Sequence, residues 1–305
     1  MNPAILVVGS SNTDMVIKTD HLPAPGETIL GGTFFMNAGG KGANQAVAAA
    51  RLGGNVSFIA KIGDDIFGRQ SLQLFREEGI DISHITYDKD HPSGVALITV
   101  DAKGENCIAV ASGANATLTP ADLETTSGKI HEFSIILMQL EIPLAAVDYV
   151  LSFASGSSTK VILNPAPASP LSDKLLSQVS ILTPNKTEAE MLTNIPITDV
   201  DSAKNAAWAL RNKGVPTVII TLGAKGALVH DESKVELIAA PLVQAVDTTA
   251  AGDVFNGALA VALTEGKDVF DATEFACRAA ALSVTKMGAQ SSIPSREKLE
   301  IAKKV

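Results

Sequence analysis

A short polar stretch ahead of an apolar segment holds the residues best suited to chemistry. The sequence runs Asp247-Thr248-Thr249-Ala250-Ala251-Gly252-Asp253, and residues 254–263 are almost all apolar or small. This pattern predicts a tight turn that opens a buried helix. The first N–H groups of a helix have no partner inside it, and the helix dipole favours anions there. Asp253 could accept a proton from a hydroxyl while these N–H groups stabilise the charge that develops.

The same spacing also fits a less specific structure. A capped core helix often has an acidic residue in its first turn, because the helix dipole stabilises a negative charge at that end. The residues alone leave both interpretations of Asp253 open.

Two stretches near the N-terminus could bind hydroxyl groups. Gly9-Ser10-Ser11-Asn12-Thr13-Asp14 follows the first apolar run and differs from the GxGxxG dinucleotide fingerprint. The second stretch, Asn37-Ala38-Gly39-Gly40-Lys41-Gly42-Ala43-Asn44-Gln45, has no Ser or Thr after its lysine, as a Walker A loop would. Its paired glycines allow close approach of a ligand, and Asn44 can both donate and accept. A simple turn in the first stretch and close helix packing in the second are the alternatives.

Three further motifs follow apolar runs. Glu141 ends the run before it, where a solvated carboxylate is the commoner outcome. Asn185 and Glu188 lie three residues apart, which suits either a hydrated Mg²⁺ beside phosphates or a plain helix cap with an acidic first turn. Thr221-Leu222-Gly223-Ala224-Lys225-Gly226 could lie against a nucleotide, although an ordinary hairpin turn explains it equally well.

Buried strands that alternate with helices must position these motifs. Apolar runs predict strands at 5–8, 56–60, 135–138, 161–163, 180–183 and 217–221, with helices at about 41–52, 66–78, 142–154 and 202–213. We expect Asp201 and Ser202 to cap the last helix and Gly214 to end it. The alternation predicts an α/β fold with a doubly wound, mostly parallel sheet covered by helices on both faces. Ligands bind at the carboxyl ends of the strands in such sheets.

Two segments, at about 13–37 and 93–112, interrupt the alternation. The first contains strand-like runs at 14–19 and 28–36, and the second has runs at 94–100 and 106–111 on either side of a turn, as in a hairpin. We expect these four strands to form a small second sheet that covers a site as a lid, within one domain of residues 1–305. An exposed apolar face of that sheet would favour pairing with a second copy of the chain.

Composition disfavours several classes of protein. The chain has 305 residues, of which 46% are apolar, and a formal net charge of −9. Nucleic acids and acidic membranes are therefore unsuitable partners. Cys107 and Cys277 suggest neither a disulfide framework nor a zinc site. The chain starts Met-Asn-Pro and continues directly into a short apolar run, and no window reaches the ~18 apolar residues of a membrane span. We expect a cytoplasmic protein.

Taken together, the motifs resemble the ribokinase-like family of sugar kinases. The similarity extends from 9–14 to Gly288-Ala289-Gln290-Ser291-Ser292-Ile293-Pro294, and it includes Gly104-Glu105-Asn106 and Asn164-Pro165-Ala166-Pro167-Ala168. Its most specific parts are 37–45 and 247–253, in the family's order and separation. The resemblance implies a doubly wound α/β domain with a β-sheet lid, homodimers joined through the lids, and transfer of the γ-phosphate of ATP to the 5-hydroxyl of D-ribose.

The resemblance also implies roles for individual residues. Asp253 matches the general base, and the anion hole is matched by Ala250, Ala251 and Gly252. The ribose site, which also includes Asp253, is matched by Asn12, Asp14, Gly39, Gly40, Lys41, Asn44 and Glu141. The ATP site is matched by Asn185, Thr221, Leu222, Gly223, Ala224, Lys225, Gly226, Gly252 and Cys277, with Glu188 as the Mg²⁺-associated glutamate. A site for K⁺, built mostly from backbone carbonyls, would comprise Asp247, Thr249, Ser283, Lys286, Gly288 and Ser292.

The sequence departs from the family pattern at two positions. Lys186 stands where a glutamate is common, and it should point away from the face that Asn185 and Glu188 share. Cys277 stands where a histidine is frequent near adenine. Stacking of adenine requires no specific side chain there.

Two alternatives to a ribose kinase remain. A related kinase could act on 2-deoxyribose, fructose or a nucleoside. Polar groups at both ends of a small site favour ribose, and an adenosine kinase should offer an aromatic platform near the lid, whereas aromatic residues make up 4% of the chain. The second alternative is a sugar-binding regulator without catalysis, which the intact Asp253 and glycine turn disfavour. Phosphoryl transfer depends mainly on positioning and charge stabilisation, which these motifs suit.

Overall fold

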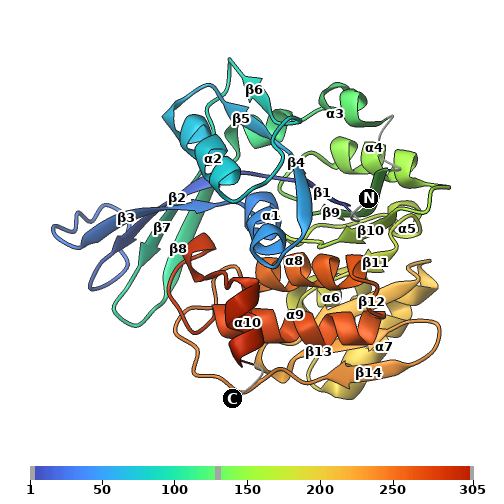
Figure 1. Ribbon diagram of the computed structural model, residues 1–305. Helices are drawn as coiled ribbons and strands as arrows, with labels where there is room; N and C mark the ends of the chain where they lie inside the picture. Colours follow the sequence, from blue (N-terminus) through green and yellow to red (C-terminus); the bar gives the residue numbers. More distant parts are fainter. Residues whose placement is uncertain (1–3, 128–131, 303–305) are drawn as a thin grey trace.

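An eight-stranded sheet with helices on both faces forms the body of the molecule (Figure 1). The computed structural model describes residues 4–127 and 132–302. The strands are β1 (Ala4–Val8), β4 (Asn55–Ile59), β9 (Phe133–Met138), β10 (Lys160–Leu163), β11 (Ile181–Leu182), β12 (Thr217–Thr221), β13 (Ala227–His230) and β14 (Val235–Ile238). Their order is β14-β13-β12-β11-β10-β9-β1-β4. Strand β13 pairs antiparallel with both β12 and β14, and all other neighbouring strands pair parallel. This arrangement confirms the predicted doubly wound, mostly parallel sheet.

Each face of the sheet has its own set of helices, because successive side chains of a strand point to opposite faces. Ile5 and Val7 belong to one buried cluster, and Leu6 and Val8 belong to the other. The first cluster packs against α1 (Lys41–Arg51), α2 (Ile66–Glu77), α8 (Ala251–Thr264), α9 (Val269–Ser283) and α10 (Arg296–Ala302). The second packs against α3 (Pro120–Ser127), α4 (Leu144–Ala154), α5 (Asp173–Leu176), α6 (Lys186–Thr193) and α7 (Val200–Asn212).

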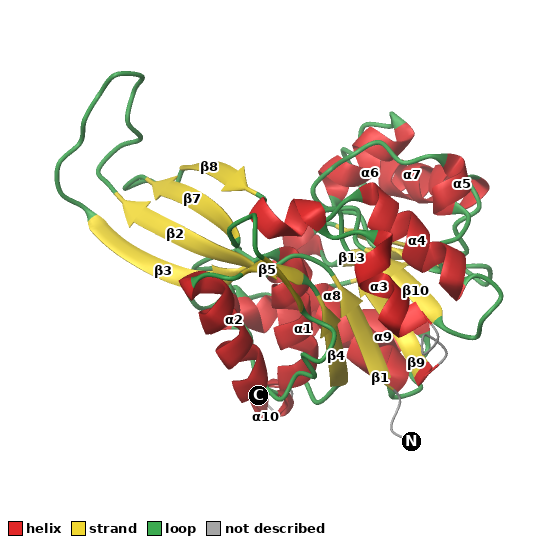
Figure 2. Ribbon diagram, turned by 90° about the horizontal axis from the view of Figure 1, so that it is seen from above, coloured by secondary structure: helices red, strands yellow, loops and turns green. Residues whose placement is uncertain are grey.

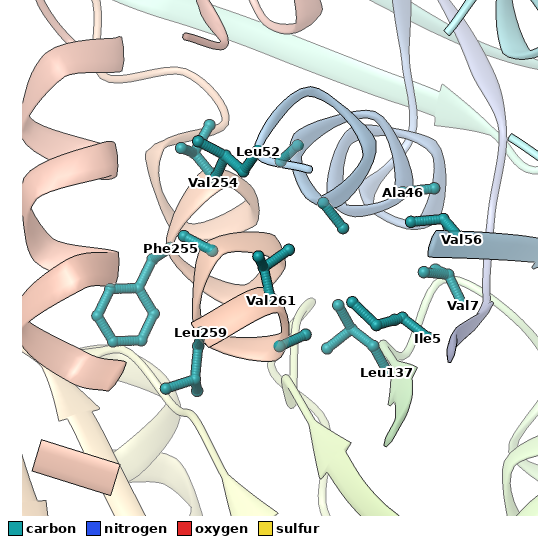
Figure 3. Close-up of a cluster of buried hydrophobic side chains, with 14 of the residues drawn as sticks. Ile5, Val7, Ala46, Leu52, Val56, Leu137, Val254, Phe255, Leu259 and Val261 are labelled. Atoms are coloured by element: carbon teal, nitrogen blue, oxygen red, sulfur yellow. The ribbon is translucent and has the colours of Figure 1, made fainter. Parts of the chain in front are cut away.

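Most residues of helix α8 are buried in the first layer. Figure 3 shows its side chains Val254, Phe255, Leu259 and Val261 in one cluster with Ile5 and Leu137 of the sheet and with residues of α1. A Cβ added to Gly257 of α8 would lie 2.7 Å from the Cβ of Ala48 in α1. The two helices therefore pack backbone to backbone, so the residues at their N-terminal ends lie close together.

A second sheet of four strands stands beside the main body (Figure 2). Its strands are β2 (Asn12–Lys18), β3 (Thr33–Gly39), β7 (Gly94–Val100) and β8 (Asn106–Ala111), in the order β3-β2-β7-β8. The predicted lid sheet and the predicted hairpin are thus confirmed. Large apolar side chains on this sheet are exposed, namely Ile17, Phe34, Met36, Leu97, Ile108 and Val110.

The expected strand at 28–36 was wrong at its start. Strand β3 begins at Thr33, and it continues to Gly39, through a stretch that the sequence suggested as a turn. Residues 20–32 instead form a loop, in which Gly31 and Gly32 have positive φ angles of 100° and 98°. Prolines at 23 and 25 also keep this segment out of the sheet ladder, since proline has no N–H to donate.

Other details of the secondary structure also differ from expectation. Asp199 rather than Asp201 caps α7, because its carboxylate accepts the N–H of Ser202 at 2.8 Å. Gly214, with φ of 99°, ends that helix as predicted. Strands β13 and β14 were not predicted, nor were β5 (Lys61–Gly63) and β6 (Thr86–Asp88), which pair with each other.

Candidate active site

The start of α8 has the geometry of an anion-binding turn. Ala250, its N-cap residue, adopts the left-handed conformation with φ of 60°, which is unfavourable for a residue with a Cβ. Within the described residues, the N–H groups of Ala250, Gly252 and Asp253 have no hydrogen-bond acceptor. The N–H of Ala251 differs, since it donates to the carbonyl of Thr248 at 3.3 Å. Three backbone donors are therefore open to a ligand at this helix end.

Asp253 is buried in the first turn of α8. Its Oδ2 accepts from Nδ2 of Asn44 at 2.9 Å, and its Oδ1 accepts from Nε2 of Gln45 at 3.0 Å. Burial raises the pKa of this carboxyl above its usual range, while Lys41 and the two amides oppose the shift. A carboxylate that is desolvated yet held by two donors is suited to accept a proton.

Lys41, at the start of α1, and Glu141, which follows β9, both interact electrostatically with Asp253. The carboxylate of Glu141 accepts from the hydroxyl of Ser10 at 2.6 Å and from the backbone N–H of Lys41 at 3.0 Å. Burial alone would lower the pKa of the Lys41 ammonium, but the carboxylates of Asp253, Glu141, Glu188 and Asp14 outweigh it and raise that pKa. Lys41 therefore stays charged among four acidic groups.

Asp14 faces the same cluster from lid strand β2, which begins at Asn12, two residues before the predicted run at 14–19. Burial, helped by the charges of Glu141 and Asp253, raises its pKa to about 6. A Cβ on Gly39 would lie 2.2 Å from Oδ2 of Asp14, so glycine there leaves room for this carboxylate. Asn12, also on β2, is held by the amide of Asn115, which donates to its Oδ1 at 2.7 Å.

Asn185 and Glu188 form a capping box at the start of α6. The two oxygens of Glu188 accept from the backbone N–H and from Nδ2 of Asn185, each at 2.8 Å. The helix cap that the sequence suggested as the alternative to a Mg²⁺ site is therefore present. Glu188 is nevertheless buried, and burial raises its pKa. It also interacts electrostatically with Lys41 and Asp253, so it belongs to the same site.

An apolar pocket of about 260 Å³ lies on the other side of the Gly252 turn. Its lining includes Thr221, Gly223, Ala224, Gly226, Ala251, Gly252, Phe255 and Cys277. Leu222, Lys225 and Asn185 line an adjoining groove that shares Thr221, Gly223 and Gly252 with the pocket. Burial and the neighbouring Glu274 raise the pKa of the Cys277 thiol to about 12, so the pocket wall there is uncharged.

Asp247 joins the two segments of the expected cation site. Its carboxylate accepts from the N–H of Thr249 at 2.9 Å and from the N–H of Gly288 at 2.8 Å. These bonds outweigh burial and lower its pKa. Ser283 ends α9, with Lys286 shortly after it, and Ser292 lies in a 3₁₀ turn in the same segment. No donor within the described residues reaches the backbone carbonyl oxygens at 247, 249, 286 and 288.

Several polar residues of the site were not assigned from the sequence. Gln45, Gln139 and Asn164 form a buried network that reaches Asp253, and Ser10 and Asn115 hold residues of the sugar side. The sequence could have suggested three of them as site residues, because Gln139 and Asn164 directly follow predicted strands and Gln45 follows Asn44. Asn115 had no such signal.

Two features are absent from the described residues. No three His, Cys, Asp or Glu side chains in 4–127 and 132–302 cluster as a protein-only metal site would. In the same residues, no helix combines the length and apolar character needed to cross a membrane.

Known proteins resemble the chain over its whole length. Residues 2–296 match the family model described as pfkB family carbohydrate kinase. The chain is 48% identical over 297 residues to a ribokinase of Haemophilus influenzae, with 97% of each chain covered. It is 38% identical over 294 residues to a deoxyribokinase of Salmonella typhi, with 96% of each covered. An Arabidopsis thaliana ribokinase, solved in complex with ribose and ATP, matches with a TM-score of 0.92 at 33% identity and 100% coverage of both chains. The chain therefore belongs to the pfkB family of carbohydrate kinases.

Proposed function

We propose that this phosphotransferase moves the γ-phosphate of ATP to the 5-hydroxyl of D-ribose. One observation carries the proposal. The held carboxylate of Asp253 lies at the open N–H groups of α8, with an apolar pocket on one side and the acidic and amide groups of the lid on the other. A phosphoryl group crossing between two such compartments would pass over the helix start.

Each compartment has the chemistry of one substrate. Asp14, Asn12, Lys41, Asn44 and Glu141 offer charged and amide groups that suit sugar hydroxyls. In this proposal the pocket beside Cys277 receives the adenine ring, and the glycines at 223 and 252 let the phosphates approach the backbone. A Cβ at Gly252 would meet no protein atom within 4 Å, so the space beside it is open to a ligand.

Asp253 then takes the proton from the attacking hydroxyl. The N–H groups of Ala250 and Gly252 donate to the oxygens of the transferring group as negative charge builds on them. Lys41, which stays protonated beside four carboxylates, adds positive charge on the sugar side. The lid sheet covers the sugar and keeps out water, which would otherwise accept the phosphate.

The residues present fit the two cations that the family implies. The carboxylate of Glu188, together with water and ATP phosphates, is a donor set that suits Mg²⁺, which would neutralise phosphate charge. The carbonyl oxygens at 247, 249, 286 and 288, which lack donors in the described chain, suit a larger monovalent ion such as K⁺. Ser283 and Ser292 would contribute from the same segment.

The proposal extends to assembly and location. The exposed apolar residues Ile17, Phe34, Met36 and Leu97 share the face of the lid sheet opposite to Asp14, and a second lid would cover this face in a homodimer. The whole chain acts as one α/β unit with lid strands at about 13–37 and 93–112. We place the enzyme in the cytoplasm, where ATP is supplied.

A substrate panel tests the proposed function. ADP release is measured with Mg-ATP and D-ribose, 2-deoxyribose, fructose or adenosine, with wild type and with Asp253→Asn. The highest kcat/KM with ribose, lost in the variant, supports the proposal. A higher kcat/KM with 2-deoxyribose, fructose or adenosine would assign the chain to a different sugar or nucleoside. Ribose binding without any turnover would indicate the regulator.

A further inference from the structure

A row of buried polar side chains runs beneath the start of α8. Gln139, Asn164 and Thr183 follow the neighbouring strands β9, β10 and β11, each one residue past its strand. All three are buried. Gln139 and Asn164 are hydrogen-bonded to Gln45, which comes from α1 and has no exposed surface. Four elements distant in sequence thus contribute to one polar network inside an apolar layer.

The hydrogen bonds of the network define the orientation of the Gln45 amide. Its Nε2 donates to Oδ1 of Asp253 at 3.0 Å and to Oδ1 of Asn164 at 3.2 Å. Its Oε1 accepts from Nε2 of Gln139 at 2.6 Å. The reversed orientation would place Oε1 against two acceptor oxygens. Asn164 is fixed in turn, because its Nδ2 donates to the carbonyl of Thr183 at 3.1 Å.

The network continues to the turn that precedes Asp253. The hydroxyl of Thr183 donates to Oδ1 of Asn256 at 2.6 Å, and Nδ2 of Asn256 donates to the carbonyl of Gly252 at 2.8 Å. Asp253 is therefore linked to the open N–H turn both along the backbone and through this network.

Gln45 differs from Asn44, the other amide that holds Asp253. Oδ1 of Asn44 is buried without a hydrogen-bond partner in the described chain, so it is free to accept from a sugar hydroxyl. The polar atoms of Gln45 are all engaged, and none is exposed. Asn44 therefore has an acceptor open to substrate, whereas Gln45 has no polar atom left for one.

We propose that Gln45 is a positioning residue that keeps Asp253 ionised and correctly aimed during turnover, and that Gln139 and Asn164 keep its amide in the donating orientation. A donor to a carboxylate stabilises the charged form. The inference rests on the proposed function of Asp253 as the general base.

Other charges also act on Asp253, and they come from four different elements. Lys41 on α1 favours the ionised form of its carboxyl. Glu141 after β9, Asp14 on β2 and Glu188 on α6 disfavour it. Gln45 is uncharged, so its replacement by another uncharged residue leaves this set intact. A change in the pKa of Asp253 then reports the lost hydrogen bond.

The test is the pH dependence of kcat for Gln45→Met, measured at saturating ribose and Mg-ATP. Methionine has a similar length and no donor. We expect the acid limb of the profile to move to higher pH by about one to two units, because loss of a hydrogen bond to the carboxylate should raise the pKa of Asp253 by about that amount. Val47→Ala, a core substitution on the same helix, is the control. It should lower the melting temperature without moving the acid limb.

A second variant covers the case in which Gln45→Met does not fold. Gln45→Leu also lacks the donor and is suited to a buried position, so we expect a shift in the same direction. An unchanged acid limb in a folded variant of Gln45 would overturn the proposal. Absence of ribose turnover in the wild type would instead refute the proposed function, so the two failures are distinguishable.

Discussion

The side-chain amide of Asn44 donates to the carboxylate of Asp253 across 2.9 Å, although 209 positions separate the two residues in the chain. The bond connects the first turns of α1 and α8, whose close packing through Ala48 and Gly257 sets their separation. The proposed base and the helix that begins at the proposed sugar site therefore have a fixed relative position. Substitutions of Asn44, in the proposed sugar site, and of Asp253, the proposed base, should therefore differ in their effects on KM and kcat.

Asp253→Asn should abolish most of the activity while preserving sugar binding. The amide keeps the shape of the side chain but cannot accept the proton, so kcat should fall by ~10²–10⁴, the usual effect of removing a positioned base. The ribose dissociation constant should change much less. Asp271→Asn, which alters an exposed acidic residue in the first turn of α9, is the control and should retain normal kcat. Near-normal turnover by Asp253→Asn would exclude it as the base.

Ribose binding should weaken as the pH falls through about 6. Burial and nearby carboxylates raise the pKa of Asp14 to about 6, so this side chain is protonated below that pH in the free protein. Only the ionised form can accept hydroxyl donors on both oxygens. Calorimetric titration with ribose between pH 5 and 8 measures the effect. Asp14→Asn should bind weakly at all of these pH values, and an equally steep profile for this variant would assign the dependence to another group.

The same carboxylate should distinguish ribose from 2-deoxyribose. If Asp14 accepts from two adjacent sugar hydroxyls, loss of one leaves a buried acceptor unpaired, at a cost of about 1–3 kcal/mol. We therefore expect a lower kcat/KM for 2-deoxyribose. Equal values for the two sugars would contradict this assignment.

Gly39→Ala should impair the sugar side of the site selectively. The added Cβ would approach Oδ2 of Asp14 to 2.2 Å, so the carboxylate or the strand must move. We expect a rise in the KM for ribose of roughly tenfold or more, since small misplacements of a binding group have large effects. The KM for ATP is the internal control and should stay near the wild-type value. Equal changes in both constants would indicate a general loss of structure.

Potassium should activate the enzyme, mainly through kcat. A cation bound by the carbonyls at 247 and 249 would order the turn that leads into Ala250 and Gly252, and N–H donors there act most strongly in the transition state. Sodium, being smaller, should replace potassium poorly. Initial rates at saturating ribose and Mg-ATP are compared in potassium, sodium and tetramethylammonium chloride at equal ionic strength. The same rate in all three salts would show that this site has no role.

The two cysteines should differ sharply in reactivity. Cys107 is exposed on the lid strand β8, whereas Cys277 is buried and its thiol has a pKa of about 12. Thiolate is the reactive form, so iodoacetamide near pH 7.5 should label Cys107 alone. Peptide mass spectrometry locates the label, and Cys107→Ser should remove it. Fast labelling of Cys277 in that variant would show that the apolar pocket lined by this residue opens widely in solution.

The local pattern of the sequence determined the elements and their order. Apolar runs predicted the strands at 5–8, 135–138 and 217–221, because a buried parallel strand needs apolar residues on both faces. The polar, glycine-containing stretch before residue 253, followed by apolar residues, likewise predicted the start of α8 from local sequence alone. Failures occurred where a local signal was weak. The start of β3 depends on its pairing with β2 across a long loop, and β13 and β14 have four residues each, too few for a distinct apolar run.

Only the tertiary structure decided what surrounds Asp253. Gln45 and Asn164 reach each other because α1 and α8 pack closely above the ends of β9 and β10. Hydrogen bonds between residues more than 100 positions apart leave no periodic trace in a sequence. The pKa of Asp14 is likewise a property of the fold, since burial and the charges of Glu141 and Asp253 act on it only after the lid and α8 have come together. Sequence therefore determined which groups are available, and packing decided their distances and their charge.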